Sequence, residues 1–204
     1  MARRQWPKIG SRTPVRVPTP HGEVQVQLAE LPGGDVLVFT AGEPSDVPVV
    51  RFQSACVFGE GLRAKDCDCG VQLDAAVKAI CEGGGVLTYA WEEGRGAGIA
   101  RKLDAIALQQ ESGIDTRQAF EQLGMPAEPR NFDNHVAALR AVFSGSEVRF
   151  ASRNPSKIAA LNRAGIQVSE RITLDTEMTG EREDVHGGDK PGQWSAGDLL
   201  SAAV

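Results

Sequence analysis

Apolar and polar residues alternate in short runs between about residues 21 and 52. Turn-forming clusters such as Pro32-Gly33-Gly34 separate the runs from one another. Alternation with a period of two is typical of strands that bury one face. The pattern therefore predicts an antiparallel sheet at the start of the fold, built from strands at Glu23–Leu28, Asp35–Thr40 and Val47–Phe52.

After residue 70 the apolar residues follow the three- and four-residue steps of helices. The clearest stripe consists of Phe132, Val136, Leu139 and Phe143, which share one face of a helix expected near 132–143. The same reasoning predicts further helices at 71–82, 99–112 and 116–123, and a short buried strand at 86–89.

A strand–helix–strand pattern follows in the last folded part of the chain. Asn154 can cap a helix whose first turn contains Pro155. Strand-like runs at 147–152 and 166–172 flank that helix. We therefore predict a mixed α+β fold, in which an antiparallel N-terminal sheet is followed by helices and a βαβ-like unit.

Length and composition set the number of domains. The chain has 204 residues, of which 41% are hydrophobic, and this suffices for one sizeable domain. We place that domain at residues 21–173. The basic, proline-interrupted segment 1–20 predicts a flexible arm, and the polar segment 174–204 predicts a mobile tail.

Charge and hydropathy exclude several classes of partner. The formal net charge of −5 disfavours a nucleic-acid-binding protein, and no apolar run approaches the length of a membrane span. The N-terminus lacks the apolar segment of a secretory signal. We therefore expect a cytoplasmic protein in a reducing compartment, where cysteines require an explanation other than disulfides.

Three cysteines fall close together, Cys56 and the pair Cys67-Asp68-Cys69. Three thiolates suit Zn2+, and three protein ligands leave one tetrahedral position for water, as in catalytic sites. Two alternatives stay open: a closed structural zinc site, with Cys81 as a conceivable fourth ligand, and a group of reduced cysteines without metal. Cys81 lies on the apolar face of its predicted helix, which favours a packing role.

Seven short stretches occur together between residues 17 and 172, and they are more specific than the cysteines alone. They are Arg51-Phe-Gln-Ser-Ala-Cys56, Cys67-Asp-Cys-Gly-Val-Gln-Leu73, Glu92-Glu-Gly-Arg-Gly-Ala-Gly98, Ala107-Leu-Gln109, Gly113-Ile-Asp-Thr116, Gln122-Leu-Gly124 and Asn154-Pro-Ser-Lys157. In order and spacing they resemble the GTP cyclohydrolase II family of riboflavin biosynthesis.

The resemblance implies a homodimeric hydrolase that takes GTP with Zn2+ and Mg2+. Such an enzyme removes C8 of guanine as formate, releases pyrophosphate and leaves a 2,5-diamino-6-ribosylamino-pyrimidinone 5'-phosphate. It further implies that Cys56, Cys67 and Cys69 hold zinc, and that Glu128 and Arg130 are catalytic, with Arg130 at the α-phosphate. The residues implied to bind substrate are Arg51, Gln72, Glu93, Gly94, Arg95, Thr116, Ser152 and Lys157.

The charges of these residues agree with a triphosphate ligand. An acidic chain must concentrate cations locally to bind it, and arginine adds bidentate geometry. Taken singly, Arg51 and Lys157 are equally compatible with solvated surface charges, and Glu128 with Arg130 is compatible with an ordinary loop pair. A guanidinium stays protonated in proteins, so Arg130 is better suited to electrostatic stabilisation than to nucleophilic attack.

The chain departs from the family pattern near the expected chemistry. Ile106 stands where the family has tyrosine, and Glu128 where it has aspartate. Gln53 and Ala55 replace family residues just before the first cysteine, Asp66 replaces an arginine and Gly96 an asparagine.

Two alternatives to the family activity follow from these departures. Loss of the tyrosine hydroxyl suggests a diverged paralogue that stops at a formylamino-pyrimidine nucleotide or serves specialised metabolism. A non-catalytic, zinc-stabilised nucleotide-binding protein is the second alternative.

Overall fold

The computed structural model describes residues 5–174, which form two compact units. The sheet unit comprises residues 5–53, 72–91 and 131–174, and the cysteine unit comprises residues 54–71 and 92–130. The tail predicted at 174–204 lies outside the described residues, apart from residue 174 itself. One catalytic domain over residues 21–173 stays a prediction.

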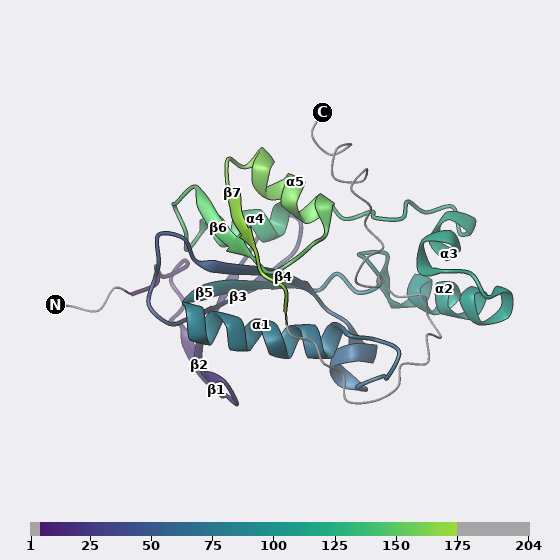
Figure 1. Cartoon of the computed structure of the whole chain (residues 1–204), viewed down its shortest axis with the longest axis horizontal. Helices are drawn as coiled ribbons and strands as arrows, with labels where there is room; N and C mark the ends of the chain where they lie inside the picture. The colour runs from purple at the N-terminus through teal and green to yellow at the C-terminus, as the bar shows by residue number, and fades with distance from the viewer. Residues whose placement is uncertain (1–4, 175–204) are drawn as a thin grey trace. The chain divides into compact units, whose positions relative to one another are not determined.

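The sheet unit is built on one mixed sheet, as the sequence predicts (Figure 1). Its seven strands follow the order β1-β2-β3-β5-β4-β6-β7. β1, β2, β3 and β5 pair antiparallel in turn, whereas β4, β6 and β7 pair parallel. The strands are β1 (Val15–Thr19), β2 (Gly22–Ala29), β3 (Val36–Ala41), β4 (Val49–Ser54), β5 (Gly85–Ala90), β6 (Glu147–Phe150) and β7 (Gln167–Arg171).

The third predicted strand takes a different neighbour from the expected one. β4 does not pair with β3, because β5 lies between them, and β4 pairs with β6 instead. β5 is buried along nearly its whole length, so it favours a central position with a partner on each side. Sequence periodicity identifies strands but does not specify which strand lies beside which.

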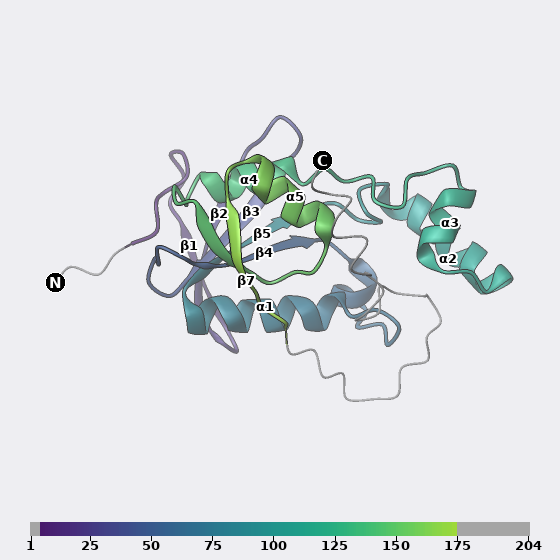
Figure 2. The same cartoon turned by 45° about the horizontal axis from the view of Figure 1, so that its top comes forward.

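The two faces of the sheet carry separate apolar clusters. Helix α1 (Cys69–Gly83) covers one face, where its Ile80 packs with Val49 and Leu87. Helices α4 (Asp133–Arg140) and α5 (Pro155–Arg163) cover the other, where Leu139 packs with Val50. Figures 1 and 2 show α1 on one side of the strands and α4 with α5 on the other. This sandwich forms the core of the sheet unit.

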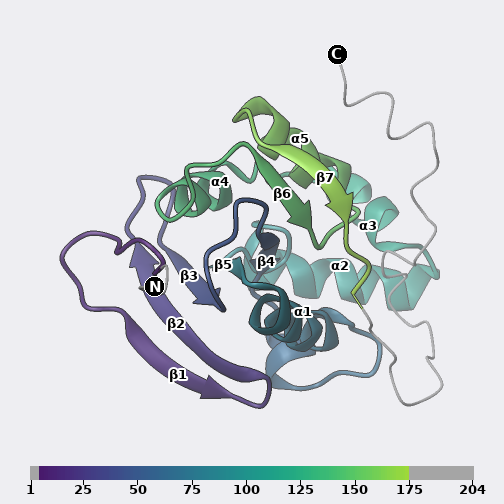
Figure 3. The same ribbon diagram turned by 60° about the vertical axis from the view of Figure 1, so that its left-hand side comes forward.

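The predicted βαβ-like unit is formed by β6, α5 and β7 (Figure 3). Asn154 caps α5 as expected, because its side-chain oxygen accepts from the backbone N–H groups of Ser156 and Lys157. The predicted helix at 132–143 is shorter in the structure, although its flanking Phe132 and Phe143 are buried as the stripe requires.

The segment expected to be a flexible arm is partly incorporated in the sheet unit. Its residues Val15–Thr19 form β1, an edge strand that pairs with β2. Trp6 donates from its indole N–H to the carbonyl of Gly42 at 3.1 Å, and Ile9 donates its backbone N–H to Gln27. Few apolar side chains of this segment are buried, which explains why the hydrophobic pattern missed the strand.

The cysteine unit contains two helices and two loops. Helices α2 (Gly98–Ser112) and α3 (Thr116–Gln122) lie side by side (Figure 2) and bury Ala105, Ala119 and Phe120 between them. The segment before α1 carries Cys56 and Cys67, Cys69 is the first residue of α1, and the loop before α2 is rich in glycine. Within residues 5–174, no helix is long and apolar enough to span a membrane.

Candidate functional site

Three sulfur atoms converge in the cysteine unit. The Sγ atoms of Cys56, Cys67 and Cys69 all lie within 4.8 Å of one another, and those of Cys56 and Cys67 are 3.4 Å apart. Two sulfurs bound to one tetrahedral zinc ion at 2.3 Å would stand roughly 3.8 Å apart. The spacing and the soft donor atoms therefore fit a single metal ion held by three thiolates.

A short π-helical turn, η1 (Val57–Gly61), brings the first cysteine to the other two. Cys56 caps this turn, since its sulfur accepts from the backbone N–H of Gly59 at 3.4 Å. A Cβ on Gly59 would stand 2.8 Å from Cys67 Sγ and 2.9 Å from Cys69 Cβ. Only glycine therefore lets the backbone pass this close to the sulfurs.

The three thiols influence one another strongly. Hydrogen bonds from Cys67 and Cys69 hold the pKa of Cys56 far below its ordinary value. The same contact with Cys56 raises the pKa of Cys67 to about 11, and contacts with both other thiols raise the pKa of Cys69. A cation bound by the three sulfurs would replace the protons that these hydrogen bonds share.

A lysine from α2 reaches the cluster. Lys102 Nζ donates to Cys56 Sγ at 3.1 Å and to Glu93 Oε1 at 2.6 Å. Burial is the largest single influence and lowers the pKa of Lys102, but the two hydrogen bonds and the charges of Cys56 and Glu93 together outweigh it, so the pKa is raised and the side chain is an ammonium. The other Glu93 oxygen accepts from the backbone N–H of Val57 at 2.7 Å.

A second ionic network lies in the same unit. Arg130 makes a bidentate pair with Glu128, with Nε–Oε1 at 2.7 Å and Nη2–Oε2 at 2.6 Å. Its Nη1 donates to Ser54 Oγ at 3.0 Å, and Ser54 in turn donates to Glu92 at 2.8 Å. The guanidinium is therefore fixed on both sides, which is the geometry that gives arginine its orientational specificity.

The Gly-rich loop turns tightly before α2. Gly94, Arg95 and Gly96 have φ of 60°, 56° and 81°, a region that favours glycine and is uncommon for arginine. Arg95 is held there because it donates to the carbonyl of Ala127 and lies 5.6 Å from the ring centre of Phe120. The loop geometry thus depends on side-chain contacts as well as on glycine.

In the sheet unit, Arg51 is buried and fully engaged with its own unit. Its guanidinium donates to Gln53 Oε1 at 2.9 and 3.1 Å, to Gln72 Oε1 at 2.7 Å and to the carbonyl of Ala151 at 2.8 Å. Two side-chain amides, one on β4 and one on α1, are therefore oriented by one arginine. The sequence predicts Arg51 to contact substrate, whereas this geometry also makes it the support of Gln72.

Lys157 is also buried in the sheet unit. Its Nζ donates to the carbonyl of Phe52 at 2.8 Å and stands 5.4 Å from the ring centre of Phe132. This places an ammonium inside the core, where the sequence taken alone suggested a solvated lysine. Nearby in the chain, Ser152 Oγ accepts from the backbone N–H of Asn154 at 3.2 Å.

The structure gathers the predicted site residues in two sets, one in each unit. Arg51, Gln72, Ser152 and Lys157 belong to the sheet unit, and the cysteines, Glu93, Gly94, Arg95, Thr116, Glu128 and Arg130 belong to the cysteine unit. Their roles toward substrate stay predictions.

Sequence reasoning missed Lys102 and Ser54, which bond directly to Cys56 and Arg130, and Glu92, which accepts from Ser54. The available signal was small: Lys102 lies one helical turn before Ile106, at the departure from the family pattern.

Comparison with known proteins shows which sequences the chain is similar to. The family model described as GTP cyclohydrolase II matches residues 11–173. GTP cyclohydrolase-2 of Azotobacter vinelandii is 40% identical over 168 residues, covering 80% of either chain. The enzyme of the same name from Pectobacterium atrosepticum is 42% identical over 78% of this chain and 82% of its own. The riboflavin biosynthesis protein RibBA of Staphylococcus haemolyticus is 37% identical over 84% of this chain and 43% of its own.

Proposed function

The chain belongs to the GTP cyclohydrolase II family, and from this premise we propose that it is a zinc-dependent hydrolase of GTP in riboflavin biosynthesis. It opens the imidazole ring at C8, releases formate and pyrophosphate, and leaves a 2,5-diamino-6-ribosylamino-pyrimidinone 5'-phosphate. The observation that carries the proposal is the convergence of the Cys56, Cys67 and Cys69 sulfurs within 4.8 Å of one another.

The cysteine cluster is proposed to hold Zn2+. Three ligands suit a catalytic rather than a closed structural site. When bound, zinc would supply a Lewis acid and an activated water close to C8 of the base. In this protein the cysteine loop brings the three sulfurs together. Lys102 donates to the sulfur of Cys56 and to Glu93, and Glu93 accepts from the backbone N–H of Val57 in the cysteine loop. Mg2+ would accompany the triphosphate.

Arg130 is proposed to stabilise negative charge at the α-phosphate while pyrophosphate departs. Preorganised donors are most effective when they need no rearrangement during reaction. Glu128 provides this order through its bidentate pair, and Ser54 fixes the remaining terminal nitrogen. The extra methylene of Glu128, relative to the aspartate of the family pattern, does not prevent the pair.

The remaining proposed substrate contacts belong partly to the sheet unit and partly to the cysteine unit. In the sheet unit, Arg51 fixes Gln72 so that its amide is oriented for the guanine, with Ser152 and Lys157 as further contacts. In the cysteine unit, Glu93, Gly94, Arg95 and Thr116 are proposed to contact the nucleotide. A cytoplasmic homodimer is the proposed state of the enzyme.

Ile106 favours a second candidate function. It is half-buried on α2, one turn after the lysine that bonds to Cys56, and it has no hydroxyl to donate or accept a proton. Ring opening requires one hydrolysis and formate release requires another. An enzyme that lacks a proton donor for the second step would accumulate a formylamino-pyrimidine nucleotide.

One experiment tests both candidates. Zinc-loaded protein is incubated with GTP and Mg2+. Formate and pyrophosphate are then measured separately, and the mass of the nucleotide product is determined by mass spectrometry. We expect formate and pyrophosphate in equal amounts. Ring opening without release of formate would establish the second candidate instead, provided that Ile106→Tyr restores formate release.

The matched cysteine variants test the metal. Cys67→Ser is expected to lose zinc and turnover together, because a cluster ligand is removed. Cys81→Ser, which alters the cysteine outside the cluster, is expected to retain both. Full turnover by metal-free protein would overturn the proposed function.

A further inference from the structure

We propose that Lys102 is a positioning residue of the metal centre, which draws electron density from the Cys56 thiolate and so keeps the bound metal a strong Lewis acid. This inference rests on the metal site of the proposed function. It concerns a side chain to which neither the sequence motifs nor the family resemblance gave a role.

The geometry places the ammonium on a single sulfur. Lys102 Nζ lies 3.1 Å from Cys56 Sγ, within hydrogen-bonding distance of a thiolate. Glu93 holds the same nitrogen at 2.6 Å, and the ring of Phe58 lies 4.9 Å from it. An ammonium bounded by a thiolate, a carboxylate and an aromatic face has a fixed position and is not a mobile surface charge.

Glu93 is itself anchored. Its carboxylate accepts from Lys102 and from the backbone N–H groups of Val57, which follows the first cysteine, and of Gly94 in the Gly-rich loop. The side chains of Lys102 and Glu93 are each 18% exposed. The carboxylate charge is thus shared among three donors, and the lysine remains directed at the sulfur.

The net charge of the metal cluster determines what such a lysine can contribute. Three thiolates on one divalent ion sum to a net charge of −1, which weakens the ion as a Lewis acid compared with neutral imidazole ligands. An N–H···S hydrogen bond withdraws electron density from the sulfur and reduces its donation to the metal. Outer contacts of this kind commonly change metal affinity or activity by about 10–100-fold.

A purely structural role for Lys102 is the alternative. In that case the lysine would only hold α2 against the cysteine loop. The two roles differ in one measurable property, the energy of the sulfur-to-metal charge-transfer transition. This energy depends on the hydrogen bond to sulfur and not on whether substrate is present.

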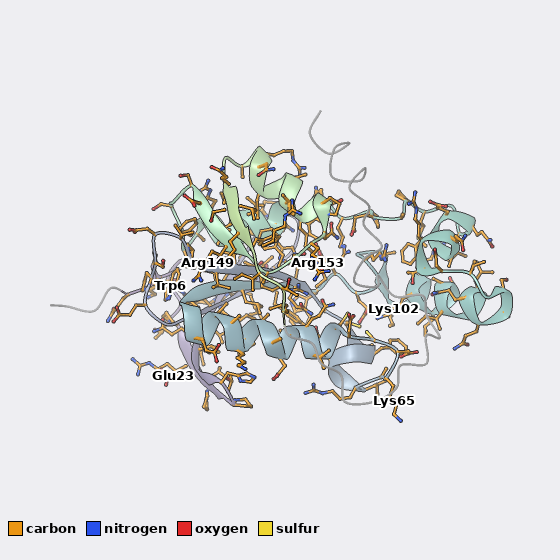
Figure 4. All side chains as sticks on the ribbon, in the orientation of Figure 1. Trp6, Glu23, Lys65, Lys102, Arg149 and Arg153 are labelled. Atoms are coloured by element: carbon orange, nitrogen blue, oxygen red, sulfur yellow. The ribbon has the colours of Figure 1, made fainter. Side chains whose placement is uncertain are left out.

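The test uses Co2+ in place of zinc, with absorption spectra of the wild type and its variants. Lys102→Met is expected to bind one Co2+ and to shift the charge-transfer band to lower energy, because the sulfur lone pair loses its hydrogen bond. Lys102→Arg keeps a cationic donor and should restore the band. Lys65→Met removes an exposed lysine from the cysteine loop and serves as the matched control (Figure 4).

Kinetics supply the second measurement. With zinc and GTP, Lys102→Met is expected to lower kcat by about 10–100-fold with little change in KM. Glu93→Gln should shift the cobalt band in the same direction but less, because the donor stays while its anchor weakens. This second variant keeps the test decisive if Lys102→Met does not fold.

Two outcomes would overturn the inference. One is an unchanged cobalt band in both Lys102→Met and Glu93→Gln. The other is loss of stoichiometric metal from folded Lys102→Met, since Lys102 would then be required for metal binding itself rather than for adjusting the Lewis acidity of the bound metal. Failure of the proposed function is distinguishable, because the wild type would then not turn over GTP while the band shift, recorded without substrate, would still occur.

Discussion

The sheet unit and the cysteine unit hold their cationic side chains in different ways, and those of the sheet unit are the more deeply buried. In the sheet unit, Arg51 and Lys157 donate to the backbone carbonyls of Ala151 and Phe52, which belong to the β-sheet region itself. In the cysteine unit, Lys102 is held by a carboxylate from a loop. Arg130 is held by its loop neighbour Glu128.

This difference separates stability from chemistry. A cation bonded to strand backbone cannot be removed without leaving buried acceptors unsatisfied, so its loss is felt in folding. A cation paired with a loop carboxylate can be substituted with less effect on stability. The apolar cluster that α2 and α3 bury contains neither Lys102 nor Arg130. Substitution of Arg51 or Lys157 should therefore lower stability in addition to any substrate contact that is lost, whereas substitution of Lys102 or Arg130 should lower activity with little loss of stability.

Arg130→Met is expected to have the largest effect on turnover. Removal of a preorganised donor from a developing negative charge costs about 10²–10³ in kcat. The melting temperature should change little, since the partners of the guanidinium, Glu128 and Ser54, are only partly buried and lie outside the apolar clusters. Arg117→Met, at an exposed pair on α3, is the control. A variant that melts earlier while its kcat is preserved would contradict the separation of roles.

Arg51→Met tests the other side of the comparison. It leaves the buried Oε1 of Gln53 and the carbonyl of Ala151 without this donor, which should reduce the free energy of unfolding by about 1–3 kcal/mol. Denaturant titration measures the loss, and Arg171→Met, at an exposed position on β7, controls for charge. Stability equal to that of the control would show that the sheet does not depend on this arginine.

Ser54→Ala should have the smallest effect. Arg130 Nη1 loses one hydrogen bond and Glu92 loses its donor Ser54, while the bidentate pair with Glu128 remains. A single hydrogen bond is worth about 0.5–1.5 kcal/mol, so kcat is expected to fall by roughly 2- to 12-fold. Steady-state kinetics measure the change in kcat, and Ser112→Ala, at the exposed end of α2, is the control. A loss as large as that of Arg130→Met would mean that Ser54 itself acts on substrate.

Much of the secondary structure was predictable because it is encoded locally. The strands β2, β3 and β5 and the helices α1, α2 and α3 lie within a few residues of their predicted bounds, and α5 begins at Pro155 as predicted. The cap at Asn154 depends on neighbouring atoms alone. The strand β1 was missed because its valines Val15 and Val17 are exposed, so its position follows from pairing with β2 rather than from burial.

The candidate site was predictable to a similar extent. Cys56, Cys67 and Cys69 were identifiable because metal ligands must be of particular residue types at short spacing. The contact of Lys102 with Cys56 and that of Ser54 with Arg130 were not, since these partners are 46 and 76 positions apart and no residue type by itself specifies a partner. Lys157 gave a misleading signal, because an isolated lysine on a helix is usually solvated.

The amino-acid sequence by itself determined the classes of element, the family of the protein and the group of three cysteines proposed to bind metal, because periodicity, motif spacing and residue chemistry are local properties. Only the tertiary structure decided that β5 lies between β3 and β4, that Arg51 supports Gln72, and that Lys102 touches the first sulfur. These three features arise from contacts between distant segments, and such contacts are fixed by packing and by the need to satisfy buried polar groups.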